Sequence, residues 1–341
     1  MKAMIIEKYG KNVPLIMSEK PMPTIGEHDV LVEIYAASLN PIDFKIKEGK
    51  AKFLLNYELP LILGNDFSGV VIKVGKRVVA FKPGDEVYGR PRKGRIGTLA
   101  EYIAIHEEDI ALKPWNLSFE EAASIPLVGL TTYQAFHDIM KLQKGQKILI
   151  HAGSGGVGTF AIQLAKVMGA YVATTASDKG YELVQSLGAD RIVNYRKENF
   201  EELLSGYDAV YDTLGGAVLE KSFQVLKPNG KIVSVSGWPN ARFGKEAKLG
   251  WLKTFLLSIV SRKITALEKK SGTTYHFLFM KPSGAQLKII GEFIEKGQIK
   301  PVIDKVFAFK DAALALHYLE GGGAKGKVVV RIKEMQDVDK G

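Results

Sequence analysis

The chain has 341 residues, a formal net charge of +10 and no cysteine. The absence of cysteine excludes disulfides, thiolate zinc sites, cysteine-ligated iron–sulfur clusters and a cysteine nucleophile. The length favours two domains, and no apolar run approaches the ~20 residues of a membrane-spanning helix. The basic residues are scattered along the chain, and no nucleic-acid-binding motif accompanies them. The first residues do not have the pattern expected of a signal peptide. We therefore expect a cytoplasmic protein that binds anionic small molecules and no nucleic acid.

Residues 1–125 are predicted to be rich in β-strands. The strands are expected at Val30–Ile34, at Gly69–Gly75, after the turn Pro83–Gly84, and at Leu99–Ile105. Many short strands joined by Gly and Pro turns are typical of a small barrel. The segment Ser118–Ala123 opens with a Ser–Glu capping box and predicts a helix at the junction of two domains.

From residue 126 to 263 the pattern changes to alternating strands and helices. The strands are expected at 147–151, 171–175, 191–193, 208–212 and 231–236, with helical segments such as Lys179–Leu187 and Ala217–Leu226 between them. This alternation predicts a doubly wound parallel sheet and an α/β class. The remainder, 264–341, holds a strand around Tyr275–Met280, two helices and a strand at Gly326–Ile332, and is expected to complete the first domain.

The glycine-rich turn after the first of these strands is the strongest functional signal. Gly153, Gly155 and Gly158 have the spacing G-x-G-x-x-G between an apolar run and a helix-like segment. In a dinucleotide site one such glycine allows the tight turn, one lets the backbone approach the pyrophosphate, and one lets the helix and the strand pack closely. The free N–H groups of the helix N-terminus then face the phosphates. We expect the cofactor to contact Gly153, Ser154, Gly155, Gly156, Val157 and Gly158.

The end of the next strand indicates which dinucleotide binds. An NAD site places Asp or Glu there to accept a hydrogen bond from the ribose 2′-hydroxyl. Here the strand runs into Ala176 and Ser177, with Lys179 just beyond. A hydroxyl and an ammonium suit a 2′-phosphate better than a diol, although Asp178 argues for NADH. We predict NADPH as the cofactor, bound in part by Ser177 and Lys179.

An apolar run, 249–260, follows the fifth strand and is flanked by lysine and arginine residues. About 12 residues are too few to span a bilayer. Four interpretations stay open: a helix that covers the substrate site, a dimer contact, a basic amphipathic surface that makes a weak contact with a membrane, and a packed helix with no role in binding.

Five short motifs follow one another along the chain: Ser38–Asp43, Gly64–Gly69, Pro83–Asp85, Ala152–Gly158 and Gly326–Val330. With them the chain resembles the medium-chain dehydrogenase/reductase superfamily over nearly its whole length, and most closely its zinc-free quinone oxidoreductase and enone (alkenal) reductase branch. The resemblance implies a GroES-like β-barrel catalytic domain at 1–125, a Rossmann NADPH-binding domain at 126–263, and a C-terminal segment, 264–341, that returns to the catalytic domain. It also implies a cleft that holds NADPH and a homodimer formed by edge-to-edge pairing of the Rossmann sheets, with 275–280 as the edge strand.

Two positions depart from the zinc-dependent alcohol dehydrogenase branch. By the resemblance, Asn40 stands where that branch has a cysteine ligand, and Asn65 stands where it has a histidine. An amide is a poor zinc ligand and Asp66 alone cannot hold the metal, so no metal site is predicted. Alcohol oxidation without zinc loses its Lewis acid. Hydride delivery to a conjugated enone or quinone needs less help, because a hydrogen-bond donor or a cation can stabilise the enolate.

The resemblance also implies roles for residues outside the glycine-rich turn. It places Lys45 near cofactor and substrate, in a loop after a barrel strand, and Asn40 can donate a hydrogen bond to a carbonyl. Asn40 and Lys45 are therefore the predicted catalytic residues, whereas Asp43 is interpreted as a cap. The resemblance further implies cofactor contacts from Thr131, Tyr195 and Lys327. Contacts from Leu214 and Gly237 are expected because both residues follow strands at the carboxyl edge of the predicted sheet, where ligands bind.

The leading prediction is a homodimeric, NADPH-dependent reductase that acts on a small-molecule quinone or α,β-unsaturated carbonyl without a metal ion. Two alternatives remain. One is an NADPH-binding protein without catalysis, such as a redox sensor. The other is a peripheral membrane protein that uses the 249–260 segment.

Overall fold

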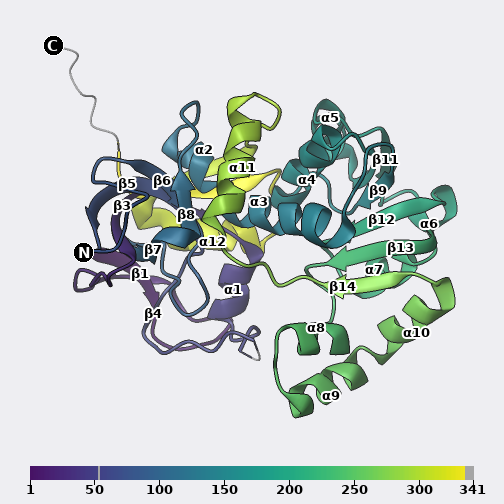
Figure 1. Ribbon diagram of the computed structural model, residues 1–341, viewed down its shortest axis with the longest axis horizontal. Helices are drawn as coiled ribbons and strands as arrows, with labels where there is room; N and C mark the ends of the chain where they lie inside the picture. The colour runs from purple at the N-terminus through teal and green to yellow at the C-terminus, as the bar shows by residue number, and fades with distance from the viewer. Residues whose placement is uncertain (53, 335–341) are drawn as a thin grey trace. The chain divides into compact units, whose positions relative to one another are not determined.

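The computed structural model describes residues 1–52 and 54–334, and its chain forms two compact units. The first unit consists of Met1–Leu130 and the segment from Lys281 onward, and the second consists of Thr131–Met280 (Figure 1). Residues 264–280 were expected to return to the first domain but belong to the second unit. The reason is that β14 (Thr274–Phe277) pairs in parallel with a strand of the second unit.

The first unit is the expected β-rich domain. Its main sheet has seven strands in the order β15-β16-β3-β5-β6-β8, with β7 also paired to β3. These strands are β3 (Asp29–Leu39), β5 (Asp66–Val74), β6 (Glu86–Gly89), β7 (Tyr102–His106), β8 (Ile110–Leu112), β15 (Ile303–Ala308) and β16 (Lys327–Arg331). A smaller sheet has the order β2-β1-β4, with β1 (Lys2–Ile6), β2 (Ile16–Glu19) and β4 (Leu61–Ile62).

Alternating apolar residues of β3 form the core of this unit. Val30, Val32 and Ile34 are fully buried and pack with Phe67 and Val87 from the neighbouring strands. The strand is longer than its apolar run predicts, because β5, β7 and β16 all hydrogen-bond to it. The helices of the unit are α1 (Pro41–Lys47), α2 (Phe119–Ala123), α11 (Gly284–Glu295) and α12 (Ala312–Glu320).

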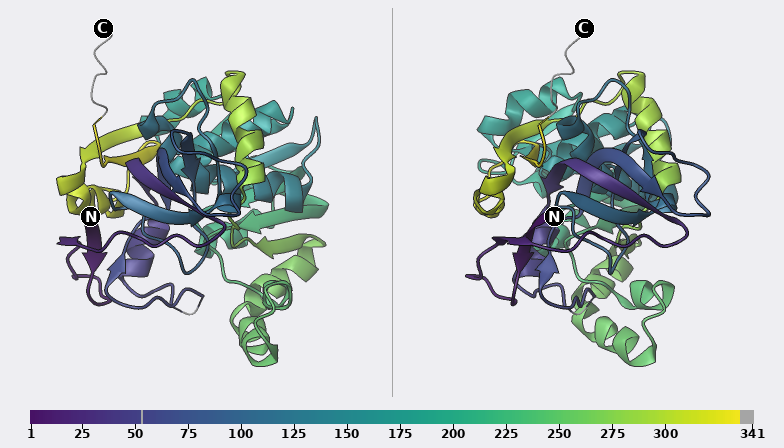
Figure 2. Two further views of the ribbon diagram at one scale, coloured as in Figure 1. Left: turned by 60° about the vertical axis from the view of Figure 1, so that its left-hand side comes forward. Right: turned by 90° about the vertical axis from the view of Figure 1, so that its left-hand side faces the viewer.

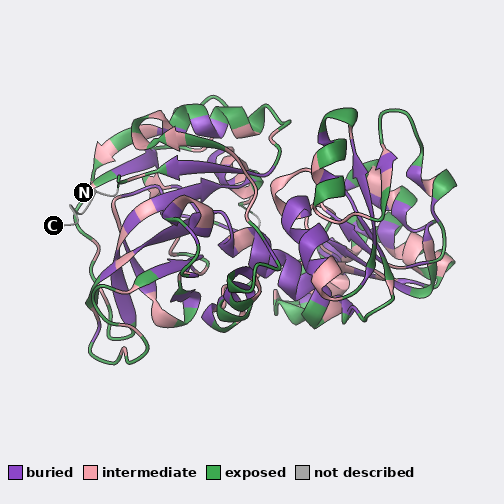
Figure 3. Cartoon of the chain, turned by 90° about the horizontal axis from the view of Figure 1, so that it is seen from above, coloured by how far each residue is buried: buried purple, intermediate pink, exposed green. Residues whose placement is uncertain are grey.

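The second unit contains the predicted doubly wound parallel sheet. Its strand order is β11-β10-β9-β12-β13-β14. The strands are β9 (Lys147–Ile150), β10 (Tyr171–Ala176), β11 (Arg191–Asn194), β12 (Tyr207–Asp212), β13 (Leu226–Ser234) and β14. β14 is an edge strand, as the dimer prediction requires, and the dimer itself stays a prediction. Figure 3 shows buried residues, in purple, along the strands of this sheet.

Short helices connect these strands. They are α4 (Gly156–Val167), α5 (Tyr181–Ser186), α6 (Phe200–Leu203), α7 (Gly216–Ser222), α8 (Ala241–Glu246), α9 (Trp251–Val260) and α10 (Arg262–Ser271). A further helix, α3 (Pro126–Tyr133), runs through the residues at which the chain passes from one unit to the next. Helices α8, α9 and α10 form a lobe beside the β14 edge of the sheet (Figure 2). In the described part of the chain, no helix combines the length and the apolar character needed to cross a bilayer.

Candidate functional sites

The glycine-rich turn joins β9 to α4, and its glycines are required for different reasons. A Cβ at Gly153 would lie 2.1 Å from Thr174 Oγ1, and a Cβ at Gly158 would lie 2.3 Å from the carbonyl oxygen of Ala152. Gly155, the N-cap of α4, has a φ of −81°, and its Cβ would meet only that carbonyl, at 3.4 Å. Neither backbone conformation nor internal packing therefore requires glycine at 155, and its small size suits a phosphate at the helix N-terminus.

Buried side chains brace this turn from the sheet. His151 Nε2 lies 2.9 Å from Ser222 Oγ, and His151 Nδ1 lies 3.3 Å from Thr175 Oγ1. The N–H groups of Ala152 and Gly153 both donate to Thr175, one to its hydroxyl and one to its carbonyl oxygen, each at 3.0 Å. Burial lowers the pKa of His151 to about 4, so the ring is neutral at neutral pH. No local pattern indicated this brace, because it depends on the pairing of β9 with β10 and on a contact with α7, both distant in the sequence.

Ser177, Lys179 and Tyr195 lie at the adjacent carboxyl ends of β10 and β11. Ala176 and Asn194 are register partners there, and the N–H of Tyr195 donates to the carbonyl oxygen of Ala176 at 3.3 Å. The structure thus brings together three residues predicted to bind the cofactor. Lys179 and Tyr195 are both exposed, so their polar groups are accessible to a ligand.

Two further basic residues, which were not predicted from the sequence, directly follow Tyr195. Together with Ser177, Lys179 and Tyr195 they form what we call the positive corner of the second unit. The Arg196 guanidinium lies 5.9 Å from the centre of the Tyr195 ring. Lys197 Nζ lies 3.0 Å from Asp178 Oδ1, which also accepts a hydrogen bond from Asn194 Nδ2 at 2.7 Å. Asp178, the residue that argues for NADH, is therefore already partnered within the protein. The pair of basic residues directly after Tyr195 was the signal that could have revealed this positive corner.

The ends of β12 and β13 hold the remaining predicted contacts of this unit. Leu214 is half-exposed, and the Gly237 N–H donates to Ser234 Oγ at 2.7 Å. A Cβ at Gly237 would lie 2.5 Å from Tyr275 Oη, so internal packing alone requires glycine there. Thr131 is a buried residue of α3.

A second candidate site, the buried polar cluster, lies in the first unit where β3 ends and α1 begins. Its members are polar or charged, and each is at most 5% exposed. They are Ser38, Asn40, Asp43, Asn65, Asp66, Arg90 and Lys327. Charged groups are buried in this way only when they are paired and hydrogen-bonded.

Lys327 is at the centre of this cluster. Its Nζ donates to Asn40 Oδ1 at 2.5 Å and to the carbonyl oxygen of Leu39 at 3.2 Å, and lies 3.3 Å from Asp66 Oδ2. Asp66 Oδ2 also accepts hydrogen bonds from Asn40 Nδ2 at 2.7 Å and from Ser38 Oγ at 2.9 Å. Burial lowers the pKa of Lys327, and the Asp66 carboxylate opposes this effect. The lysine expected to contact the cofactor is therefore one half of an internal ion pair.

Asp43 links the cluster to α1. Asn40, Pro41 and Asp43 begin this helix where a loop was expected, and the Asn40 N–H donates to Asp43 Oδ2 at 2.7 Å. Asp43 Oδ1 accepts a hydrogen bond from Asn65 Nδ2, also at 2.7 Å. This is the capping role that the sequence indicated. Burial raises the pKa of Asp43 from its ordinary 3.8 to about 6, against the opposing effect of these hydrogen bonds.

We expect Asp43 to make the stability of the protein depend on pH. Because the pKa of Asp43 is raised on folding, its contribution to the free energy of unfolding is full below about pH 3.8 and is lost as the pH rises through about 6. An Asp43→Asn variant cannot ionise, so wild type should lose stability relative to it between about pH 4 and pH 7. The expected change is on the order of 3 kcal/mol, measured by urea unfolding. Parallel pH profiles of the two proteins would contradict it.

The cluster does not fit a zinc ion. The side-chain amide of Asn40 is hydrogen-bonded to Lys327 and Asp66, and that of Asn65 donates to Asp43. The Lys327 ammonium already provides a cation beside Asp66. An ammonium in this place would repel a divalent metal, and amides are weak ligands for it. Across residues 1–52 and 54–334, no three His, Cys, Asp or Glu side chains are grouped so that they could hold a metal ion.

Lys45 projects from the same helix but is not part of the cluster. Its side chain is half-buried and has no hydrogen-bond or ion-pair partner among the described residues. Burial and the nearby Lys50 lower its pKa. By contrast, Lys47 donates to the carbonyl oxygen of Lys11 at 2.8 Å, and Lys50 pairs with Glu48 at 2.5 Å. Lys45 is therefore the lysine of α1 that is available to a ligand.

Comparison with known proteins agrees with this architecture. Residues 26–115 match the family model of the alcohol dehydrogenase GroES-like domain, and residues 187–330 match a model described as zinc-binding dehydrogenase. The chain is 40% identical over 342 residues to 2-methylene-furan-3-one reductase of Solanum lycopersicum, covering 97% of this chain and 79% of the relative. It is 38% identical, with the same coverage, to the chloroplastic NADPH-dependent alkenal/one oxidoreductase of Arabidopsis thaliana.

A solved structure extends the similarity to the whole fold. The quinone oxidoreductase from Coxiella burnetii superposes with a TM-score of 0.83 at 33% identity, covering 98% of this chain and 99% of that one. The two-unit architecture and the predicted α/β class are thereby confirmed. The chain belongs to the medium-chain dehydrogenase/reductase superfamily, in its branch of quinone oxidoreductases and alkenal/one reductases.

Proposed function

We propose that the protein uses NADPH to reduce quinones or α,β-unsaturated carbonyls without a metal ion. The observation that supports this most strongly is that Asn40 and Asn65, which by the resemblance stand at two ligand positions of the zinc-dependent branch, are hydrogen-bonded within the buried polar cluster around the Lys327–Asp66 pair. A reaction that needs no Lewis acid suits such a centre. The names of the tomato and Arabidopsis relatives, and that of the Coxiella structure, point to the same chemistry.

The turn and the positive corner of the second unit suit the proposed cofactor. When bound, NADPH supplies the hydride. The N–H groups at the start of α4, beside Gly155, are free to bind the pyrophosphate. Ser177, Lys179 and Arg196 can bind the 2′-phosphate through a hydroxyl and two cations.

In the first unit, Lys45 is the proposed catalytic residue. The amide oxygen of Asn40 and one of its amide hydrogens are committed to Lys327 and Asp66, so we assign to Asn40 the task of holding the first turn of α1. Lys45 has no such commitment. Its ammonium can stabilise negative charge on the substrate oxygen or bind the ribose of the cofactor.

The direct test is NADPH oxidation with a panel of quinones, enals and enones, using chelator-treated protein. Full activity after chelation is the expected result. Activity that returns only when zinc is added would contradict the proposal, as would the absence of turnover with every member of the panel.

Lys45→Ala should separate the two roles open to this lysine. If the ammonium stabilises the developing enolate, kcat and kcat/KM should fall together by about 100-fold or more. If it only binds cofactor, the KM for NADPH should rise while kcat holds. Lys73→Ala, at an exposed lysine of β5 far from Lys45 in the sequence, is the control. Equal kinetics of the two variants would remove Lys45 from the site.

Lys179→Ala should weaken the preference for NADPH. We expect the KM for NADPH to rise by up to about 100-fold, because a charged hydrogen bond contributes about 1–3 kcal/mol, while the KM for NADH hardly changes. Arg196→Ala should act in the same direction. If both variants kept the wild-type ratio of kcat/KM for NADPH and NADH, the 2′-phosphate would have to bind elsewhere.

A further inference from the structure

Helix α9 directs its apolar side chains outward. Six large apolar residues are between 46% and 80% exposed: Trp251, Leu252, Phe255, Leu256, Ile259 and Val260. At 100° per residue they cover about half of the helix circumference. Within α9, all of whose residues are described, Leu257 alone is buried, and Thr254 packs against Gly244 of α8. This is the reverse of a helix that packs its apolar face into its own protein.

The three helices of this lobe carry a strong positive charge. Residues 241–271 contain two acidic residues, Glu246 and Glu268, against eight basic ones: Arg242, Lys245, Lys248, Lys253, Arg262, Lys263, Lys269 and Lys270. This excess is more than half of the net charge of the chain, which is +10. Basic residues occur throughout the chain, but much of their excess over acidic residues falls in this lobe, even though Arg242 pairs with Glu268 and Lys263 pairs with Glu220.

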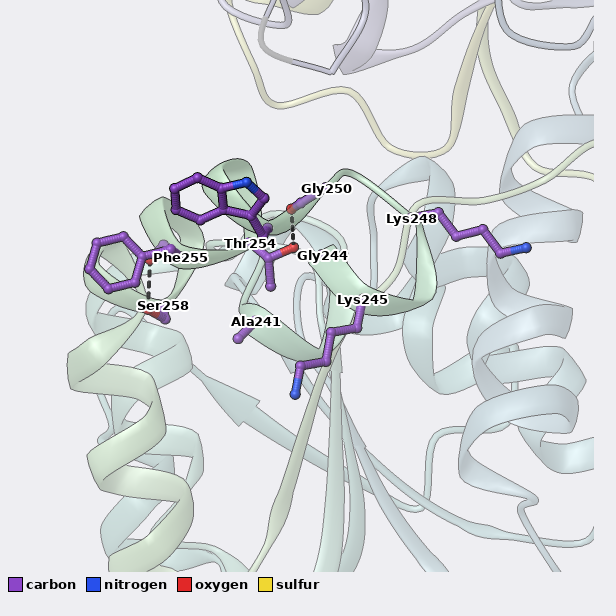
Figure 4. A pocket seen from close by; sticks show the side chains of 9 residues that line it. Ala241, Gly244, Lys245, Lys248, Gly250, Thr254, Phe255 and Ser258 are labelled. Atoms are coloured by element: carbon purple, nitrogen blue, oxygen red, sulfur yellow. Dashed lines mark hydrogen bonds between the residues drawn. The ribbon is translucent and has the colours of Figure 1, made fainter.

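The two kinds of side chain meet between α8 and α9. A shallow pocket of about 590 Å³ lies there, lined by Lys245, Lys248, Trp251 and Phe255 among others. In Figure 4 the Lys245 side chain extends from α8, the Phe255 ring from α9, and the Lys248 side chain from the turn that joins the two helices. Neither lysine forms an ion pair with any residue in the described part of the chain.

We propose that α9 and its basic neighbours bind the surface of a membrane that contains anionic lipids. The six apolar side chains would enter the boundary between headgroups and acyl chains, and Lys245 and Lys248 would bind lipid phosphates. A helix with an apolar outer face and flanking cations has the chemistry that such an interface requires.

The positive charge of the lobe also favours an anionic membrane over a second copy of the chain as the partner of the apolar face of α9. In a dimer that packed α9 against the same helix of a second copy, two surfaces with the same large positive charge would repel each other. An anionic bilayer instead neutralises the charge while it covers the apolar face. This inference does not depend on the proposed reductase activity.

The test is flotation of the full chain with two kinds of vesicle: phosphatidylcholine alone, and equal parts of phosphatidylcholine and phosphatidylglycerol. We expect binding to the anionic vesicles that weakens as salt is added. Trp251→Ser/Phe255→Ser and Lys245→Glu/Lys248→Glu should each lower the partition coefficient at least tenfold. Brominated lipids should quench tryptophan fluorescence in wild type and much less in Trp251→Phe, since the chain has three tryptophans.

Matched controls come from the first unit. Trp115 is 77% exposed against 80% for Trp251, and Lys76 and Lys82 are exposed lysines far from α9 in the sequence. Trp115→Ser and Lys76→Glu/Lys82→Glu should bind vesicles as wild type does. Equal binding to both vesicle types, no binding by wild type, or α9 variants that bind like the controls would each overturn the proposal. So would an α9 variant that changes the oligomeric state measured by light scattering while it still binds vesicles.

Discussion

Replacing Lys327 by methionine is expected to lower the free energy of unfolding by about 3–5 kcal/mol. The Lys327 ammonium lies 3.3 Å from Asp66 and also donates to Asn40 and Leu39. Methionine fills a similar volume but leaves the buried Asp66 carboxylate without the cation that pairs with it. Loss of one partner of a buried pair costs far more than loss of a surface pair.

Lys333 offers a matched control for this substitution. It follows β16 and pairs with Glu33 at 2.7 Å, but its side chain is 43% exposed. Lys333→Met should cost at most about 1 kcal/mol. A double variant, Asp66→Asn/Lys327→Met, should recover part of the stability lost in Lys327→Met, because it removes both charges. Thermal and urea unfolding followed by circular dichroism provide the measurement. Equal losses for Lys327→Met and Lys333→Met would contradict a buried ion pair.

The parts of the fold that were predicted correctly depend on local patterns. The glycine-rich turn lies between a strand and a helix, as its flanking residues indicated, and the capping box at Ser118 begins α2 as expected. Parallel strands of the second unit were found because their apolar runs alternate with helical segments. Asp43 was interpreted as a cap because helix N-terminal signals lie within three or four residues of one another.

The parts that were missed depend on pairing between distant segments. Lys327 reaches Asn40 because β16 pairs with β3 in the register Val328–Leu39, and no local pattern specifies that register. In the same way His151 meets Ser222 across 71 residues of sequence. The predicted domain boundary at residue 263 separated β14 from its sheet, although the dimer prediction had already placed 275–280 at the edge of that sheet. Resemblance to a family drew attention to Lys327, but its burial could be learned only from the structure.

Substitutions at two glycines of the turn are expected to separate folding from cofactor binding. In Gly158→Ala the new methyl group would lie 2.3 Å from the carbonyl oxygen of Ala152 and 2.6 Å from the Cα of Gly153. Backbone atoms cannot move aside cheaply, so we expect a loss of about 3 kcal/mol in stability. In Gly155→Val the φ of −81° suits valine, so the melting temperature without ligand should stay close to that of wild type.

The same Gly155→Val variant should weaken NADPH binding by about 100-fold or more, because its side chain would stand where the pyrophosphate approaches the N–H groups of α4. Calorimetric titration gives the Kd, and thermal unfolding without NADPH gives the stability. Gly321→Val is the control, since Gly321 is exposed, has a φ of −64° and lies far from the turn in the sequence. If Gly155→Val lost stability as Gly158→Ala does, glycine at 155 would be needed for the fold, and its small size would no longer be evidence of a phosphate site. If it kept both stability and affinity, the cofactor would have to bind away from the start of α4.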